Sequence, residues 1–341
     1  MPNNLRRKME IRSLNNLNIG FVYDLRDDYL KEGFTEEHVA EFDTEWTVSS
    51  IARTLTELGC RVHRIGNAKA LLRELMAGKR WDLVFNIAEG IKGRSRESQV
   101  PAILELFDIP YTMSDPLVCA ATLDKEIAKK LVRAAGLPTP ASCVVKSEQD
   151  VVAVDLKYPL FAKPIAEGTG KGVDAKSKIT DPAQLAAVCR NLLGLFKQPV
   201  LVEEYLPGRE FTTAILGTGP KARVLGTLEF RIKPDAPAQD YSYEVKEYCE
   251  KYVEYFPMPK DKKRQEVEAL ALACYRALEC RDTGRVDIRL DADGNPSFME
   301  VNPLPGMNPG HSDLPMIATQ EGMSYNELLR EIVISALERV K

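Results

Sequence analysis

The feature that most restricts the fold is a regular alternation of short apolar strands and amphipathic helices between residues 18 and 112. Apolar or alternating runs predict strands, and apolar residues at helical spacing predict helices. Strands that alternate with helices typically form an open parallel sheet covered by helices, so the chain is expected to begin with a parallel α/β domain. The expected strands are 18–23, 61–65, 82–86 and 109–112, and the expected helices are 48–58, 68–76 and 101–107.

A glycine-rich segment, Glu167-Gly168-Thr169-Gly170-Lys171-Gly172, follows an expected strand at 159–164. A helix at 182–195 and a strand at 200–204 are expected after it. Glycines allow tight turns and leave backbone N–H groups free to surround phosphate oxygens. The segment is neither a Walker loop, because no Ser or Thr follows its lysine, nor a dinucleotide fingerprint, because it does not follow the first strand. Taken alone, such a segment is more often a plain turn.

Two expected strands near the C-terminus carry a sharper pattern. Asp287 lies on the first, and Glu300 and Asn302 lie two residues apart on the second, so these two side chains point to the same face. The turn 291–294 can bring Asp287 beside them. Two carboxylates and an amide oxygen suit Mg²⁺, with a triphosphate completing the coordination. The loop 303–308 can turn backbone N–H groups toward an oxyanion. The competing interpretation is a solvent-facing hairpin with incidental acids.

Two runs are especially distinctive: FMEVNPLPGM at 298–307 and GMSYNEL at 322–328. The first resembles the metal and oxyanion motif of the D-alanine–D-alanine ligases, a family of ATP-grasp enzymes, and the second resembles that family's closing helix. The resemblance extends from about Trp81 to the C-terminus, with the matching segments in the family's order. Several spaced motifs in one order are far more specific than any one of them. The other matching segments are 109–112, 123–125, 136–140, 202–205 and 208–210.

The resemblance implies roles for individual residues, and the lysines suit phosphate as compact cations. The implied ATP contacts are Lys125, Lys163, Glu167, Gly168, Thr169, Gly170, Glu203, Glu204, Tyr205, Leu206, Glu210 and Lys246. The implied magnesium ligands are Asp287, Glu300 and Asn302. The implied catalytic groups are Arg285 and the Gly306 amide, for the acyl-phosphate and tetrahedral states, and Ser312, for a substrate carboxylate.

Both halves of the first-substrate pocket depart from the family. The family's Gly-Gly-x-Ser-x-Glu loop after the first strand is replaced by an acidic insert that extends to Glu45. Its His-Gly-x-x-Gly-Glu-Asp-Gly loop is replaced by the more cationic segment 89–97. Glu89, Arg94 and Arg96 are therefore candidate substrate contacts, the arginines for an extra carboxylate or phosphate, although exposed loop arginines often have no such role. The first substrate is expected to differ from D-alanine.

Composition argues against other classes of function. A net charge of −4, with 28% charged residues, does not indicate a nucleic-acid partner, and the basic run 260–264 is better interpreted as a solvated surface. The seven cysteines are scattered and fit reduced thiols. No run approaches the roughly 18 apolar residues that span a bilayer. A cytoplasmic protein without nucleic-acid or membrane partners is expected.

The chain is therefore expected to be an α/β protein with an ATP-grasp fold. The expected parts are a flexible lead-in 1–17, an N-terminal parallel-sheet substrate domain 18–114, a central lid domain 115–206, and a C-terminal α+β domain 207–341 with the metal and oxyanion site. The glycine-rich segment and the loop 235–243 are expected to close over ATP.

The expected function is an ATP-dependent carboxylate–amine ligase that forms an amide or dipeptide bond through an acyl phosphate and releases ADP and phosphate. ATP, two Mg²⁺ ions with Mn²⁺ as a substitute, small amino acid or carboxylate substrates and a homodimer are expected. Two alternatives stay open at this point: a D-alanine–D-alanine ligase of cell-wall synthesis, and a catalytically silent nucleotide-binding protein.

Overall fold

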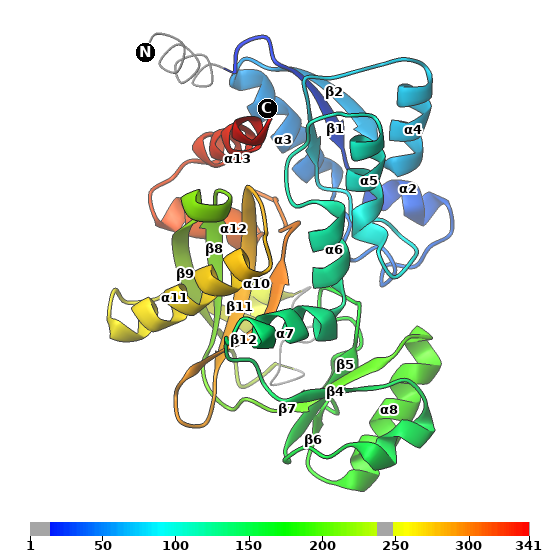
Figure 1. Ribbon diagram of the computed structural model, residues 1–341, viewed down its shortest axis with the longest axis vertical. Coiled ribbons are helices and arrows are strands. Elements are labelled where there is room, and N and C mark those ends of the chain that lie inside the picture. The colour runs from blue at the N-terminus through cyan, green and yellow to red at the C-terminus, as the bar shows by residue number, and fades with distance from the viewer. Residues whose placement is uncertain (1–13, 237–247, 341) are drawn as a thin grey trace.

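The computed structural model describes residues 14–236 and 248–340, apart from the side chains at 249 and 250 (Figure 1). Lys246 and most of the loop 235–243 lie outside the described residues, as do residues 1–13 of the expected lead-in. Residues 14–17 are packed rather than free, because Leu14 is buried in the core and the Asn16 amide donates to the Gly59 carbonyl at 2.8 Å.

The N-terminal sheet is parallel, as expected, in the order β2 (Arg61–Gly66), β1 (Asn18–Val22), β3 (Leu83–Asn86). The expected fourth strand is reduced to one bridge between Val84 and Tyr111, because Pro110 has no N–H to extend the ladder. The helical elements of this part are α2 (Arg26–Lys31), α3 (Glu45–Glu57), α4 (Ala68–Met76), η1 (Arg96–Ser98) and α5 (Gln99–Leu106).

The acidic insert after β1 folds onto the neighbouring loop. Tyr29, Val39 and Phe42 form a small apolar cluster within it. The buried carboxylate of Asp24 accepts hydrogen bonds from the Tyr29 hydroxyl at 2.5 Å and from the Gly90 amide at 2.8 Å. The two segments that differ from the family pattern are therefore in contact with each other.

The central sheet is antiparallel, in the order β4 (Ser142–Val145), β7 (Val200–Glu204), β5 (Leu160–Pro164), β6 (Lys178–Ile179). Its helical elements are η2 (Glu148–Ala153) and α8 (Pro182–Phe196). This sheet and α8 have an apolar core of their own at the lower end of the molecule (Figure 1).

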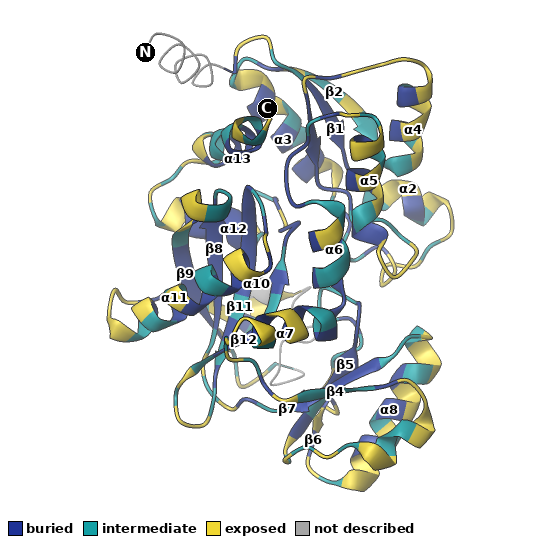
Figure 2. Ribbon diagram, viewed as in Figure 1, coloured by how far each residue is buried: buried dark blue, intermediate teal, exposed yellow. Residues whose placement is uncertain are grey.

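The C-terminal sheet is also antiparallel, and its strands lie mostly buried beneath helices whose outer sides are exposed (Figure 2). Its order is β10 (Val253–Pro257), β9 (Arg223–Ile232), β8 (Glu210–Leu216), β11 (Thr283–Leu290), β12 (Pro296–Asn302). The remaining elements are α6 (Pro116–Leu123), α7 (Lys125–Ala134), η3 (Gly219–Lys221), α10 (Cys249–Tyr252), α11 (Lys262–Ala277), α12 (Asp313–Gln320) and α13 (Tyr325–Arg339).

The apolar cores do not divide at residue 115, where the central domain was expected to begin. Val118 of α6 and Val132 of α7 pack into the C-terminal core with Phe298 of β12. The helices α12 and α13 share another core with α3 and the N-terminal sheet. The N-terminal and C-terminal parts therefore form one packed body, and the central sheet is attached to it as a separate unit.

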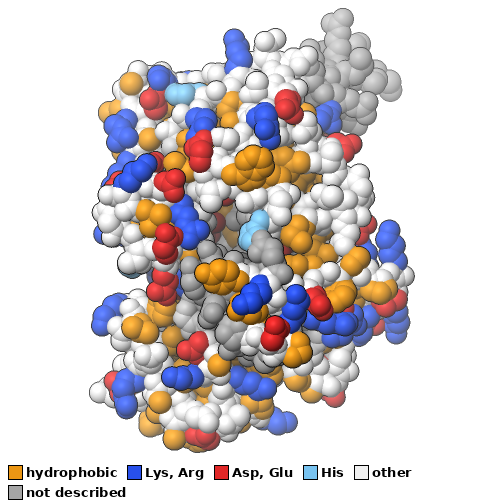
Figure 3. Space-filling model, turned by 180° about the vertical axis from the view of Figure 1, so that it is seen from behind, with side chains coloured by type: hydrophobic (Ala, Val, Ile, Leu, Met, Phe, Trp, Pro, Cys, Tyr) orange, Lys and Arg blue, Asp and Glu red, His pale blue; other side chains and the backbone are white. Residues whose placement is uncertain are grey.

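Acidic side chains accompany the basic run at the start of α11. Arg264 pairs with Glu268 and Glu321, each at 2.6 Å, and Lys263 pairs with Glu266. Figure 3 shows basic and acidic side chains side by side along this edge of the molecule. This arrangement favours a solvated surface over a phosphate-backbone site. Within the described ranges, no helix has both the length and the apolar character needed to cross a bilayer.

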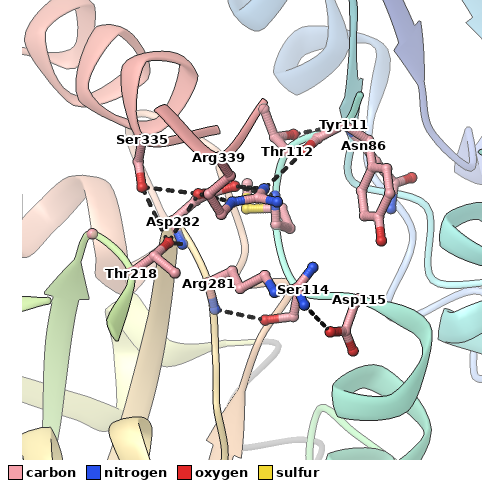
Figure 4. Close-up of polar contacts among 12 residues, drawn as sticks. Asn86, Tyr111, Thr112, Ser114, Asp115, Thr218, Arg281, Asp282, Ser335 and Arg339 are labelled. Carbon is pink, nitrogen blue, oxygen red and sulfur yellow. Dashed lines mark hydrogen bonds and ion pairs between the residues drawn. The ribbon is translucent and has the colours of Figure 1, made fainter. Parts of the chain in front are cut away.

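A fully buried carboxylate, Asp282, fastens the start of β11 to the last helix and to the N-terminal part (Figure 4). It accepts hydrogen bonds from the Arg339 guanidinium at 2.6 Å, the Ser335 hydroxyl at 2.8 Å and the Met113 amide at 2.9 Å. Arg339 also donates to the Tyr111 carbonyl at 2.9 Å. The Asp282 carboxylate therefore holds together three segments that are far apart in the sequence.

We predict that Asp282→Ala lowers the free energy of unfolding by about 3–5 kcal/mol, because it leaves the Arg339 charge without its buried partner. Urea unfolding measures this. The matched control is Glu338→Ala, which breaks the exposed pair with Lys221 (2.8 Å) and should cost less than about 1 kcal/mol. Similar small losses in both variants would contradict the role given to Asp282.

Candidate active site

The hairpin of β11 and β12 sets the geometry of the site. Asp287 pairs with Glu300, and Arg285 pairs with Asn302. Residues that are opposite each other, or two apart, project from the same face of a sheet, so all four side chains lie on one face. The turn 291–294 closes the hairpin as expected, with its glycine at φ +80°. A register shift just after Asp287 marks a bulge, a feature that often aims side chains beside active sites.

The three residues expected to bind magnesium are brought together. The Asn302 amide lies 3.2 Å from the Asp287 carboxylate, which also accepts the Thr212 hydroxyl at 2.7 Å. Glu300 lies 3.5 Å from the Lys125 ammonium. No cluster of three His, Cys, Asp or Glu side chains that could hold a metal was found among the described residues. Mg²⁺ usually takes one or two carboxylates and completes its shell with water and substrate phosphates, a shell to which Asp287, Glu300 and Asn302 could contribute oxygens.

A buried charge triplet includes Lys163, which was expected to contact phosphate. The Glu203 carboxylate lies 2.8 Å from the Lys129 ammonium and 3.0 Å from that of Lys163. Burial alone would raise the pKa of Glu203, but the two lysines outweigh burial and lower the pKa to about 2. Burial likewise acts to lower the pKa of Lys163, but Glu203 and Glu300 raise it, which keeps the ammonium charged. The Glu203 side chain therefore holds Lys129 and Lys163 in place.

The expected nucleotide residues lie around one cavity of about 110 Å³. At the expected hinge, the Tyr205 amide donates to the Pro159 carbonyl at 3.0 Å, and both Tyr205 and Leu206 line the cavity. Glu210 pairs with Arg289 at 3.4 Å. The other expected residues that line the cavity are Lys125, Lys163, Glu167, Gly168, Thr169, Gly170, Glu203, Glu204, Asp287 and Glu300.

A second cavity of about 380 Å³ adjoins the first and shares Lys125, Arg285 and Glu300 with it. Gly306 and Ser312 line this cavity. A Cβ atom at position 306 would lie 2.7 Å from the Ser312 hydroxyl, so the Ser312 side chain would have to shift to admit a larger residue than glycine. Within the described ranges the Gly306 amide donates to no acceptor. This N–H group is therefore free to donate a hydrogen bond into the cavity.

The residues expected to contact the substrate separate into two places. Glu89 lines the second cavity, whereas Arg94 and Arg96 line a neighbouring cleft of about 1040 Å³. Arg94 is 73% exposed and pairs with Asp124 at 2.7 Å. Arg96 is 7% exposed and pairs with Glu41 at 2.9 Å. The structure thus does not bring the two arginines to the cavity that holds the oxyanion loop.

The glycine-rich loop is fastened to the acidic insert by buried ion pairs. Lys171 of the loop lies 3.2 Å from Glu41 and 2.7 Å from Glu167, and Arg96 donates to the Ala166 carbonyl at 2.9 Å. Burial acts to raise the pKa of Glu41, but Arg96 and Lys171 lower it, so the carboxylate stays charged. The insert therefore holds the loop over both cavities.

Several residues that contact the expected site residues were not identified from the sequence. Lys129 lies one helical turn after Lys125, a spacing that indicates a shared helix face. Asp313 directly follows Ser312 and pairs with Arg285 at 2.9 Å. Thr212 and Glu41 gave no local signal, because their partners are distant in the sequence.

Comparisons with known proteins agree with this geometry. The family model described as the D-Ala-D-Ala ligase C-terminus matches residues 131–334. An uncharacterised protein of Sinorhizobium fredii is 35% identical over 75% of both chains. The D-alanine–D-alanine ligase of Bordetella petrii is 34% identical over 85% of this chain and 86% of its own.

Among solved structures, the D-alanine–D-alanine ligase from Bacillus anthracis complexed with ATP superposes with a TM-score of 0.71 at 23% identity. The match covers 94% of this chain and 98% of that one. The predicted ATP-grasp fold is confirmed.

We predict that Glu41→Gln loosens the glycine-rich loop. Loss of a charged hydrogen-bond partner costs about 1.5–3 kcal/mol, so hydrogen exchange across 167–172 should quicken by roughly 10- to 150-fold while exchange in β5 is unchanged. Exchange followed by mass spectrometry measures this. Glu37→Gln, an exposed change in the same insert, is the control, and equal exchange in both variants would contradict the fastening.

Proposed function

Because the chain belongs to the D-alanine–D-alanine ligase family and is an ATP-grasp ligase, we propose that it activates a substrate carboxylate with ATP and joins it to an amine. The observation that supports this most is that residues of the β11–β12 hairpin, together with Lys125 of α7, line two adjoining cavities. Glu300, Lys125 and Arg285 stand between a cavity that contains the hinge and Lys163 and a cavity that contains Gly306. A phosphoryl donor and a carboxylate acceptor would meet at that junction.

The smaller cavity is the proposed ATP site. Adenine would lie against the hinge at 204–206, and the triphosphate against Lys125, Lys163 and the glycine-rich loop. Lys246, outside the described residues, is proposed as a third phosphate lysine. Ligand pockets usually measure about 300–1,000 Å³, so a cavity of about 110 Å³ requires the loop or the central sheet to move outward before ATP enters. The separate core of the central sheet allows such movement.

Asp287, Glu300 and Asn302 would hold Mg²⁺. We propose two ions, with Mn²⁺ able to replace them. When bound, the ions would neutralise triphosphate charge that lysines alone hold poorly.

In the proposed reaction, an oxygen of the substrate carboxylate attacks the γ-phosphorus and the bond to ADP breaks, which leaves an acyl phosphate. The amine then attacks the acyl carbon. The Gly306 amide and Arg285 would stabilise the oxyanion, worth about 3 kcal/mol for one well-placed donor. Phosphate leaves and the amine loses a proton. The glycine-rich loop would exclude water, which otherwise hydrolyses the acyl phosphate.

We propose small amino acids or carboxylates other than two D-alanines as the substrates, because the insert and the segment 89–97 rebuild the first-substrate pocket. A D-alanine–D-alanine ligase is the nearest alternative. A silent nucleotide binder is less favoured, since it needs no free amide at Gly306. The free, mostly buried cysteines among the described residues suit the cytoplasm, where we expect a homodimer without nucleic-acid or membrane partners.

We predict that Glu300→Gln lowers amino-acid-dependent ADP release by at least about 100-fold, because the charge stabilisation given by a metal is worth several kcal/mol. A coupled ADP assay with pools of amino acids measures this. The control is Glu254→Gln, an exposed change on β10, which should leave the rate unchanged. Near-normal ADP release by a folded Glu300→Gln protein would contradict the assignment of Glu300 as a metal ligand. ATP binding by the wild type without ADP release from any pool would favour the silent binder.

A further inference from the structure

Three carboxyl groups from separate segments line the cavity of about 380 Å³ that also contains Gly306: Asp43 from the insert, Glu89 after β3, and Glu97 from η1. Glu97 is the most revealing, because it lines the cavity and is only 7% exposed. In the ranges 14–236 and 248–340, no hydrogen bond or ion pair joins its carboxylate to another residue. The same holds for the carboxylates of Asp43 and Glu89.

The arginines and the lysine that line this cavity or act on its carboxyl groups have other partners. Arg26 lines the cavity and pairs with Glu36 at 2.7 Å. Arg96 donates to both oxygens of Glu41, at 2.9 and 3.1 Å, and Lys125 donates to the Glu167 carbonyl at 2.6 Å. Arg285 is held by Asp287 and Asp313 on the hairpin side of the cavity. The cavity therefore presents its oxyanion donors at one side and an excess of carboxylates at another.

Carboxylate charges without cationic partners are unfavourable in a buried site. Burial raises the pKa of Glu97 to about 7, an effect that Arg96 only partly offsets, and burial together with Asp24 raises the pKa of Asp43 to about 7. Burial raises the pKa of Glu89 well above its usual value, and Glu97 and Glu41 add to this. A buried carboxylate without a partner is destabilising, whereas a cationic ligand would remove that cost.

We propose that one substrate carries a basic group, an ammonium or guanidinium, in addition to its reacting groups, and that Glu97 and Glu89, with Asp43, bind it. This inference rests on the proposed function and specifies the charge class of its substrate. A simple amino acid offers a single ammonium for three carboxyl groups, so an amino acid with a basic side chain fits better. The arginines expected to bind an added anion lie in the neighbouring cleft and are already paired.

The test compares basic amino acids with neutral counterparts of similar shape, in D and L forms: lysine with norleucine, ornithine with norvaline, and arginine with citrulline. Calorimetry with MgADP present measures binding, and the ADP assay measures kcat/KM. At least one basic member should exceed its neutral counterpart by about 10- to 150-fold in both measurements, as expected of a charged hydrogen bond. Its binding near pH 7 should also release protons, seen as an enthalpy that depends on the buffer.

Two variants assign the preference to the carboxyl groups. Glu97→Gln should bring the ratio of basic to neutral substrate toward one and reduce proton release, while KM for ATP stays unchanged. Glu89→Gln is the second variant, should the first fail a thermal unfolding check. Glu37→Gln, which removes an exposed acid outside this cavity, should keep the wild-type ratio.

The inference and the proposed function can fail separately. If every neutral member binds as tightly as its basic counterpart, or if both Gln variants fold and keep the wild-type ratio, the inference is overturned. ADP release with neutral amino acids would then still support a ligase. If no amino acid triggers ADP release, the proposed function fails, and calorimetry alone still decides whether the cavity prefers a basic group.

Discussion

The site depends on the register of two strands. The pairing of β11 with β12 places Asp287 opposite Glu300 and Arg285 opposite Asn302, so the proposed metal ligands and the proposed oxyanion group Arg285 share one face. A slip of one residue would turn one strand's side chains to the opposite face. The register is held by the turn 291–294 and by β8, which pairs with the other edge of β11. The arrangement of the two cavities follows from this pairing.

Opposite charges are separated along the site. Toward the hinge, Lys163 and Lys125 face the proposed triphosphate, and Glu203 holds Lys163 in its charged form. Toward the N-terminal part, Glu89 and Glu97 line the proposed substrate side. A polyanion and a cation-bearing substrate would thus each meet charge of the opposite sign, with the hairpin face between them.

Part of this molecule could be predicted from sequence. Periodicity located β1, β2 and β3, and the turn signal between Asp287 and Glu300 located the hairpin of β11 and β12, because both signals are local. The boundary between α6 and α7 could not be predicted, although Asp124 caps α7 and α6 ends directly before it. The segment 116–123 is apolar without helical periodicity, so the pattern gave no signal there.

Contacts between distant segments could not be predicted. The network of Glu41, Arg96 and Lys171 joins the insert, the segment 89–97 and the glycine-rich loop, and no spacing rule relates them. The sequence also does not specify which way a loop side chain faces. Arg96 therefore appeared to be a substrate group, although it is buried beside Glu41, and Glu97 gave no sign that it lines the cavity.

The central claim is that the substrate carboxylate is phosphorylated before the amine attacks, and an oxygen-transfer measurement tests it most directly. The purified protein would be given ATP, Mg²⁺, an amine and a carboxylate substrate labelled with ¹⁸O on both oxygens. Mass spectrometry of the released phosphate reads the outcome. The account predicts one ¹⁸O in each phosphate and one retained in the amide product. Product formation with unlabelled phosphate would contradict an acyl-phosphate route.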